Sequence, residues 1–353
     1  MPTGLEGFDD DAKGQAEFFV SRGVKVYARL LDTVVRLVAE REPLVRGALL
    51  EAWAGRAFHA SYERPLLLLA SLRQDAMSTP HHPLAGAIGS DSSGDAAISA
   101  DDVVASFATH APAREALAHR FVQTNEVTRA IAWRLALGRF PAGKPVHLVD
   151  LGCSAGLNLV ADRIELGWTG ANGGPMPLPK TDAVTARIGL DRSPIDPRRD
   201  AERAWLRACL WPGQTDRRRR LDAALEAASA AMTRGEMSLH SRTALAMPEF
   251  LEEHAASKAA RGAAVLAYQT VLTSYLEPAE RAAYLAAMGA WSRGGAEGER
   301  LWIELEDAPR DATDGPAELR AHGKGGTLVL GHGEYHPSTI RLDSRAMGEL
   351  PRL

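Results

Sequence analysis

Residues 146–160 read VHLVDLGCSAGLNLV and contain the side chains best suited to chemistry. The run from Gly152 to Gly156 matches G-x-S-x-G, the turn that presents a nucleophilic serine in hydrolases, which would make Ser154 the nucleophile. The same letters place an acid, Asp150, two residues before Gly152, and a second glycine four residues after it. That spacing suits a turn wrapped around a nucleotide. Both readings need a strand before the turn and a helix after it, so the surrounding elements must decide between them.

The hydrolase reading requires several strands and an oxyanion loop before the turn. The sequence before Val146 is predicted to be helical instead, and it contains no His-Gly-Gly loop. Chain order is all that supports a catalytic partner for Ser154. The histidines available downstream include His240, His322, His332 and His336. A serine hydrolase therefore stays an alternative, and the cofactor reading is favoured.

The cofactor reading explains more of the residues in the turn. Asp150 ends a predicted strand, where open parallel sheets bind their ligands, and a carboxylate there suits a cationic or hydroxylated ligand. Gly152 and Gly156 allow the backbone to approach a ligand closely. The segment LNLVADRI is predicted to be a helix whose first N–H groups are free to bind, and Ser154 and Asn158 add polar groups. The simpler alternative is a strand-to-helix turn whose glycines only pack.

The spacing also bears on the cofactor. A dinucleotide site usually has G-x-G-x-x-G without an acid two residues before the first glycine. Asp150-x-Gly152 followed by Gly156 resembles the pattern of class I S-adenosylmethionine-dependent methyltransferases. That resemblance implies that these three residues hold the methionine end of the cofactor. A nicotinamide-dependent oxidoreductase and a non-catalytic binder of an adenosyl cofactor remain as alternatives.

The resemblance assigns further roles at the ends of the next strands. Asp191, in GLDRSP, is expected to bind the ribose hydroxyls, although it lies 41 residues after Asp150 where about twenty is usual. The extra length is the insert GWTGANGGPMPLPK, read as a substrate lid or a surface loop. The third strand end reads HSRTALAM and lacks the acid that methyltransferases often turn toward adenine.

Two more groups of polar residues are candidates for cofactor contact. Gln123 and Asn125 belong to a QTNE run that interrupts a helical pattern. They reach over the cofactor in one reading; in the other, Thr124 caps a new helix that begins with Asn125 and Glu126. Gln269 follows Tyr268 at the end of the fourth predicted strand, where methyltransferase substrates meet the methyl donor. No residue is assigned as a general base.

The remaining constellations favour structural roles. His332 and His336 have metal-binding spacing only on a helix, and the glycines and proline of GHGEYHPS favour a loop, so no metal site is predicted. The four arginines at 217–220 point all around a predicted helix start, which favours separate ion pairs over phosphate binding.

The arrangement of apolar residues divides the chain near residue 140. Residues 1–140 are predicted to form an all-α domain, and 141–353 an α/β domain. Residues 141–353 resemble a class I methyltransferase domain, which implies a Rossmann-like sheet. In the second part strand-like runs alternate with helical segments, which predicts a mostly parallel sheet. Only GEYHP separates the last two strands, too short for a crossover, so they should form an antiparallel hairpin. The expected strands cover 146–151, 184–190, 237–242, 263–269, 300–306, 327–332 and 338–342.

Composition limits the function further. The chain has 353 residues, a net charge of −4 and 45% hydrophobic residues, which gives no support for nucleic-acid or membrane binding. Two cysteines, Cys153 and Cys209, exclude a disulfide framework and fit a reducing cytoplasm. We therefore expect a cytoplasmic protein that acts on a small molecule, with its oligomeric state open.

A string of longer motifs resembles one bacterial family over nearly the whole chain. The motifs are RFVQTNEVTR, LVDLGCSAGLNLVADR, RIGLDRSPIDP, RAWLRACLWPGQTDRRRRLDAAL and VLAYQTVLTSYL, in this order. The family is the uncharacterised domain of unknown function 2332. This resemblance supports the fold and implies no particular reaction.

Overall fold

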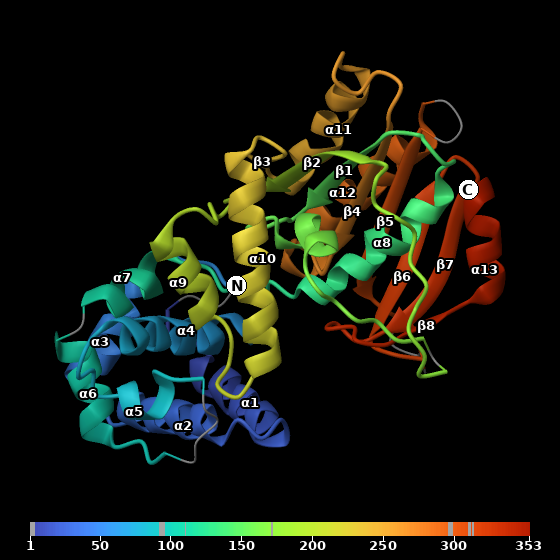
Figure 1. The fold of residues 1–353 in the computed structure, drawn as a ribbon. Coiled ribbons are helices and arrows are strands. Elements are labelled where there is room, and N and C mark those ends of the chain that lie inside the picture. Colours follow the sequence, from blue (N-terminus) through green and yellow to red (C-terminus); the bar gives the residue numbers. More distant parts are fainter. Residues whose placement is uncertain are drawn as a thin grey trace. The chain divides into compact units, whose positions relative to one another are not determined.

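The computed structural model describes residues 4–91, 96–109, 111–170, 172–295, 299–309, 312 and 314–353. These residues form two compact units (Figure 1). The first contains residues 1–124 and 200–219, and the second contains 125–199 and 220–353. The units do not follow the expected division at residue 140, because the helical turns just before the first strand pack on the second unit's own sheet.

The first unit is built from amphipathic helices. In α2, valines, leucines and Tyr27 recur every three or four residues and are buried, which is why this segment forms a helix with one apolar face. Trp205 of α9 donates a hydrogen bond from Nε1 to the Phe121 carbonyl at 3.1 Å, and α9 packs on α4. The helices are α1 (Phe8–Ser21), α2 (Lys25–Ala39), α3 (Pro43–Ala52), α4 (Glu63–Ser78), α5 (Ala85–Ile88), α6 (Ala100–Thr109), α7 (Ala111–His119) and α9 (Asp200–Ala208).

The second unit is an α/β fold around a mixed sheet with eight strands in the described residues, in the order β3-β2-β1-β4-β5-β6-β7-β8. The strands from β3 to β5 are parallel, and β6, β7 and β8 each run antiparallel to the preceding neighbour. The strands are β1 (Val146–Leu151), β2 (Val184–Asp191), β3 (Met237–Ser241), β4 (Ala264–Thr270), β5 (Arg300–Asp307), β6 (Ala317–Gly323), β7 (Gly326–Gly333) and β8 (Ile340–Leu342).

All seven expected strands are present, and the expected hairpin of β7 and β8 is confirmed. The sequence reading missed β6, which lies between β5 and β7. Its apolar residues alternate with Glu318, Arg320 and His322, so only one of its faces is apolar.

Helices and short 3₁₀ turns complete the second unit. One apolar core lies between the sheet and helices α11 and α12, and it includes Val149, Ala267 and Trp302. Figure 1 shows α8 crossing in front of the strands. These elements are η1 (Val127–Ala130), α8 (Ile131–Ala136), η2 (Leu137–Arg139), η3 (Leu157–Arg163), η4 (Ala244–Ala246), α11 (Met247–Ala256), η5 (Thr273–Tyr275), α12 (Pro278–Arg293), α13 (Ser344–Glu349) and η6 (Leu350–Arg352). Helix α10 (Thr215–Thr233) begins in the first unit and continues in the second.

None of the helices in the described residues is long and apolar enough to cross a membrane.

Candidate ligand site at the carboxyl ends of strands β1 and β4

The strand order marks a candidate ligand position between two particular strands. From β1 the chain proceeds outward to β2 and β3, whereas from β4 it proceeds in the other direction to β5. Open α/β sheets bind ligands at the carboxyl ends of the strands where the order reverses in this way. Here that point is the boundary of β1 and β4, where Asp150 lies in register beside Tyr268.

Asp150 is a buried acid whose hydrogen bonding is incomplete. It is 2% exposed, and its Oδ2 has no hydrogen-bond partner among the described residues. Burial raises its pKa to about 7; the Tyr268 hydroxyl beside it lowers the pKa, and the Asp191 charge raises it. The Tyr268 hydroxyl has no partner of good hydrogen-bond geometry in the described residues, although it faces the Asp150 carboxylate; burial and that neighbouring carboxylate hold its pKa well above the usual value. An unpaired buried polar group is costly, so these atoms are suited to a polar ligand.

Ser154 adds a third unpaired buried atom to the same turn. Its φ of +50° is unusual for a residue other than glycine, and its Oγ has no partner in the described part of the chain. Its backbone is fixed, because its N–H donates to Asp191 Oδ2 at 2.9 Å and its carbonyl accepts from Ile195 N at 3.0 Å. A nucleophilic serine is activated by a general base within hydrogen-bond reach, and none contacts Ser154 Oγ in the described residues, which argues against the hydrolase reading.

The two glycines are needed by the protein itself. Gly152 and Gly156 have φ values of +81° and +67°, which residues other than glycine adopt only with backbone strain. A Cβ on Gly152 would lie 3.0 Å from Leu272 Cδ1, and one on Gly156 would lie 2.9 Å from Leu239 Cδ2. Backbone conformation and packing therefore account for both glycines, and their contact with a cofactor stays a prediction.

Asp191 uses both carboxylate oxygens to hold the turn. Oδ2 accepts from Ser154 N, and Oδ1 accepts from Ser193 N at 2.8 Å. A carboxylate has further lone pairs, so ribose binding by Asp191 stays a prediction. Its established contacts are those of an aspartate that holds a turn.

The segment after the turn differs from expectation. It is the 3₁₀ helix η3 rather than an α-helix, so ligand binding by N–H groups at its start stays a prediction. Asn158 lies in η3. In the amide orientation that gives the side-chain nitrogen acceptors, this nitrogen donates to the carbonyls of Glu126 and Val127, each at 3.2 Å. Asn158 thus links η3 to the start of η1.

Gln269 belongs to a buried network. Its Nε2 donates to Glu306 Oε1 at 2.9 Å, and its Oε1 accepts from the Tyr284 hydroxyl at 2.5 Å and from Trp302 Nε1 at 3.2 Å. The residue is 0% exposed. Both ends of its amide are engaged within the protein, so a cofactor contact by Gln269 stays a prediction that would require this network to open.

Sequence reasoning did not single out Glu306, the centre of that network. It is fully buried, and burial raises its pKa to about 7, although the hydrogen bonds from Thr273, Leu272 and Gln269 lower it. The strand RLWIELED offered a signal, because Glu304 and Glu306 fall on one face of an otherwise apolar run.

The QTNE run does not continue a helix. Helix α7 ends at His119, and residues 120–126 are irregular. Glu126, rather than Thr124, caps the next turn, because its Oε1 accepts from Thr128 N at 3.3 Å. Gln123 belongs to the first unit. Asn125 belongs to the second, with φ +38° and a buried Nδ2 that has no partner within the described ranges.

The insert after η3 is fixed at one end. The Trp168 side chain is buried and donates from Nε1 to the Thr128 carbonyl at 2.8 Å. The Thr169 N–H donates to the Ser338 carbonyl at 3.0 Å, next to β8. This end of the insert is therefore attached to η1 and to the segment before β8, and a substrate lid stays a prediction.

The histidine pair and the arginine run have structural partners. His332 Nε2 lies 3.1 Å from Glu318 Oε2, and the described residues contain no group of three or more metal-ligating side chains. The arginines contact different groups: Gln214 and Thr124 for Arg217, Asp91 for Arg218, Asp216 for Arg219 and Glu126 for Arg220.

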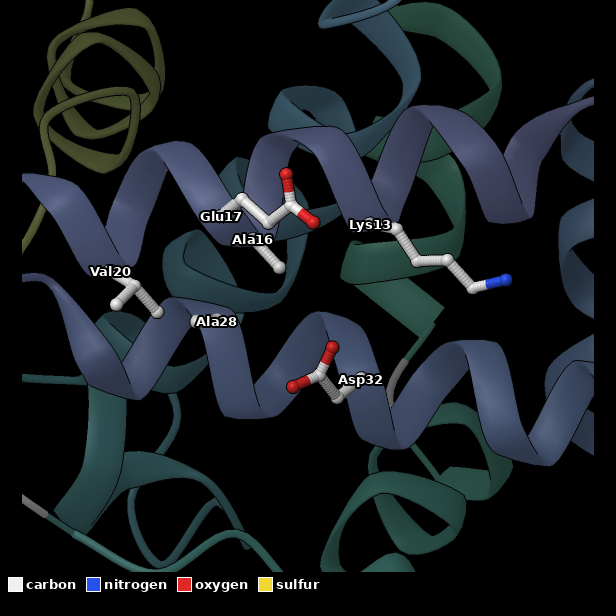
Figure 2. A pocket seen from close by; sticks show the side chains of 6 residues that line it. All are labelled: Lys13, Ala16, Glu17, Val20, Ala28 and Asp32. Carbon is white, nitrogen blue, oxygen red and sulfur yellow. The ribbon is translucent and has the colours of Figure 1, made fainter.

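A cavity of about 310 Å³ lies in the first unit, between α1 and α2 (Figure 2). Asp32 of α2 extends its carboxylate toward α1, and Glu17 and Lys13 lie along α1. The residues lining it are Lys13, Ala16, Glu17, Val20, Ala28 and Asp32. None of them belongs to the predicted site.

Comparisons with known proteins agree with the motif resemblance. Residues 10–341 match the model of a family described as an uncharacterised protein conserved in bacteria, domain of unknown function 2332. No curated protein and no solved structure gave a significant match. Because the family model covers most of the chain, the protein belongs to the domain of unknown function 2332 family.

Proposed function

We propose that the carboxyl ends of β1 and β4 bind the methionine end of S-adenosylmethionine, and that the protein is a methyltransferase acting on a small molecule in the cytoplasm. The observation that carries this proposal is a set of three buried polar atoms at the ends of β1 and β4 whose hydrogen bonding is incomplete: Ser154 Oγ has no partner in the described residues, and Asp150 Oδ2 and the Tyr268 hydroxyl face only each other, without good hydrogen-bond geometry. They lie where the strand order of the sheet reverses, the position at which such sheets bind ligands.

Each of these groups suits the amino-acid end of this cofactor. The ionised Asp150 carboxylate pairs with an ammonium group, and the hydroxyls of Ser154 and Tyr268 donate to a carboxylate. Asp191 fixes Ser154 by its backbone and so positions the turn. When bound, the sulfonium cofactor supplies an electrophilic methyl group. The protein's part is then to align an acceptor and exclude water, which is catalysis mainly by positioning.

Calorimetric titration with S-adenosylhomocysteine tests the proposal. The wild-type protein should bind it, and Asp150→Asn, which keeps the shape and removes the charge, should bind at least about tenfold more weakly. Asp196→Asn is the matched control, because that half-buried acid follows β2 and pairs with Arg198 instead. Affinity should also rise as the pH increases through about 7, since Asp150 becomes ionised there.

The outcomes separate the alternatives. Absence of binding at millimolar S-adenosylhomocysteine would overturn the proposal. Binding of NAD(H) in its place would favour an oxidoreductase, and labelling of Ser154 by a fluorophosphonate would favour a hydrolase. Binding without methyl transfer to any acceptor would leave a non-catalytic binder of the adenosyl cofactor.

A further inference from the structure

The segment that follows β4 has a strained backbone. Val271 has a φ of +57°, in the left-handed region that β-branched residues strongly avoid. Strain of this kind persists only where surrounding contacts impose it, and it is found at segments that move or bind. Val271 lies directly after the strand that borders Asp150.

The next residue covers the glycine turn. The Leu272 side chain is half-buried, and its Cδ1 lies 3.0 Å from the position that a Cβ on Gly152 would occupy. It also packs against the core between the sheet and helices α11 and α12. Leu272 thus fills the space beside Gly152, at the edge of the sheet where a ligand would approach.

One buried carboxylate holds this segment in place. Glu306 Oε1 accepts from Leu272 N at 2.8 Å, and Oε2 accepts from Thr273 N at 3.2 Å and from Thr273 Oγ1 at 2.7 Å. These bonds attach the segment to the end of β5. Their favourable free energy offsets the cost of the strained backbone at Val271. The segment is therefore held in a conformation that is well hydrogen-bonded but strained.

We infer that residues 271–275 form a gate over the glycine turn, with Leu272 as its closing side chain and Glu306 as its latch. Opening moves Leu272 away from Gly152, releases the strain at Val271 and gives a ligand access to the turn. The ligand class rests on the proposed function, whereas the motion of the gate does not.

Hydrogen–deuterium exchange tests the gate on the full chain without a ligand. The amides of Leu272 and Thr273 should exchange through a local opening, faster than those of β1, which require unfolding of the sheet. Val271→Asn should slow their exchange about fivefold, because asparagine tolerates a positive φ better and the closed state loses strain. Leu272→Ala should speed their exchange about tenfold, because it removes the contact with Gly152.

A matched control separates gating from general loosening. Leu276 packs on the same core, but the three atoms nearest to the Cβ position of Gly152 all belong to Leu272, so Leu276→Ala should leave the ratio of gate to β1 exchange unchanged. Exchange of the Leu272 and Thr273 amides at the β1 rate, or no response to Val271→Asn, would overturn the gate. A gate that opens in a protein that binds no S-adenosylhomocysteine would refute the proposed function alone.

Discussion

Substitution of Gly156 by alanine distinguishes a packing glycine from one kept for a ligand. The backbone there has φ +67°, and placing an alanine in this region costs about 1 kcal/mol. The new Cβ would also lie 2.9 Å from Leu239 Cδ2 and 3.3 Å from Met237 Sδ. Both neighbours are ends of flexible side chains, so the crowding adds about 1–2 kcal/mol. The free energy of unfolding should therefore fall by about 2–3 kcal/mol.

Urea denaturation followed by circular dichroism measures this loss, and Gly262→Ala is the matched control. Gly262 has φ +80° and nothing within 4 Å of its Cβ position, so its substitution should cost only about 1 kcal/mol. In a Leu239→Ala background, the cost of Gly156→Ala should fall to the control value. Equal losses at both glycines would refute the packing argument. Unchanged stability with lost ligand binding would show that Gly156 serves the ligand.

Three further predictions concern stability. His147 Nδ1 lies 2.9 Å from His254 Nε2, and burial holds the pKa of both side chains below 6.5. The folded state therefore takes up fewer protons than the unfolded state, and the free energy of unfolding should decrease as the pH falls from above 6.5 through the folded-state pKa values. Denaturation at several pH values should show a weaker pH dependence in His254→Gln. Asp162→Ala should cost about 3–5 kcal/mol in urea unfolding, because it leaves the buried Arg187 guanidinium without its bidentate partner. Glu306→Gln should lower the free energy of unfolding by about 2 kcal/mol in the same assay, because an amide NH₂ group then replaces one acceptor oxygen opposite the N–H groups of Leu272 and Thr273.

The strands could be predicted from sequence because strands that are buried on both faces consist mainly of apolar residues. Runs such as VHLVDL and AAVLAYQ are apolar on both faces, as buried parallel strands must be. β6 was missed because its charged face interrupts the apolar pattern. Glu318 and Arg320 contact each other there, and Arg320 also pairs with Glu304. The alternation of Ala317, Leu319 and Ala321 was the available signal.

The site could be predicted only in part, because the same residue types serve ligands and loops. Asp150 was found from its place at a strand end, and the structure adds that one of its oxygens is unpaired. Asp191 and Gln269 have equally suggestive positions, yet their polar atoms are engaged by Ser154 and Glu306. Sequence spacing contains no information on which hydrogen bonds are already made. That distinction appears only when distant segments are brought together.

The composition of the first unit from two chain segments has a consequence for synthesis on the ribosome. Helix α9 packs on α4 and is made only after residues 125–199. Synthesis proceeds at about 5–20 residues per second, and α4 ends at Ser78 whereas α9 ends at Ala208, so the surface of α4 that α9 covers waits roughly 6–26 s for its partner. A nascent chain that has reached residue 124 therefore exposes apolar helix surface that its own sequence cannot yet bury. A chaperone that binds exposed apolar helix surfaces could bind α4 during this interval.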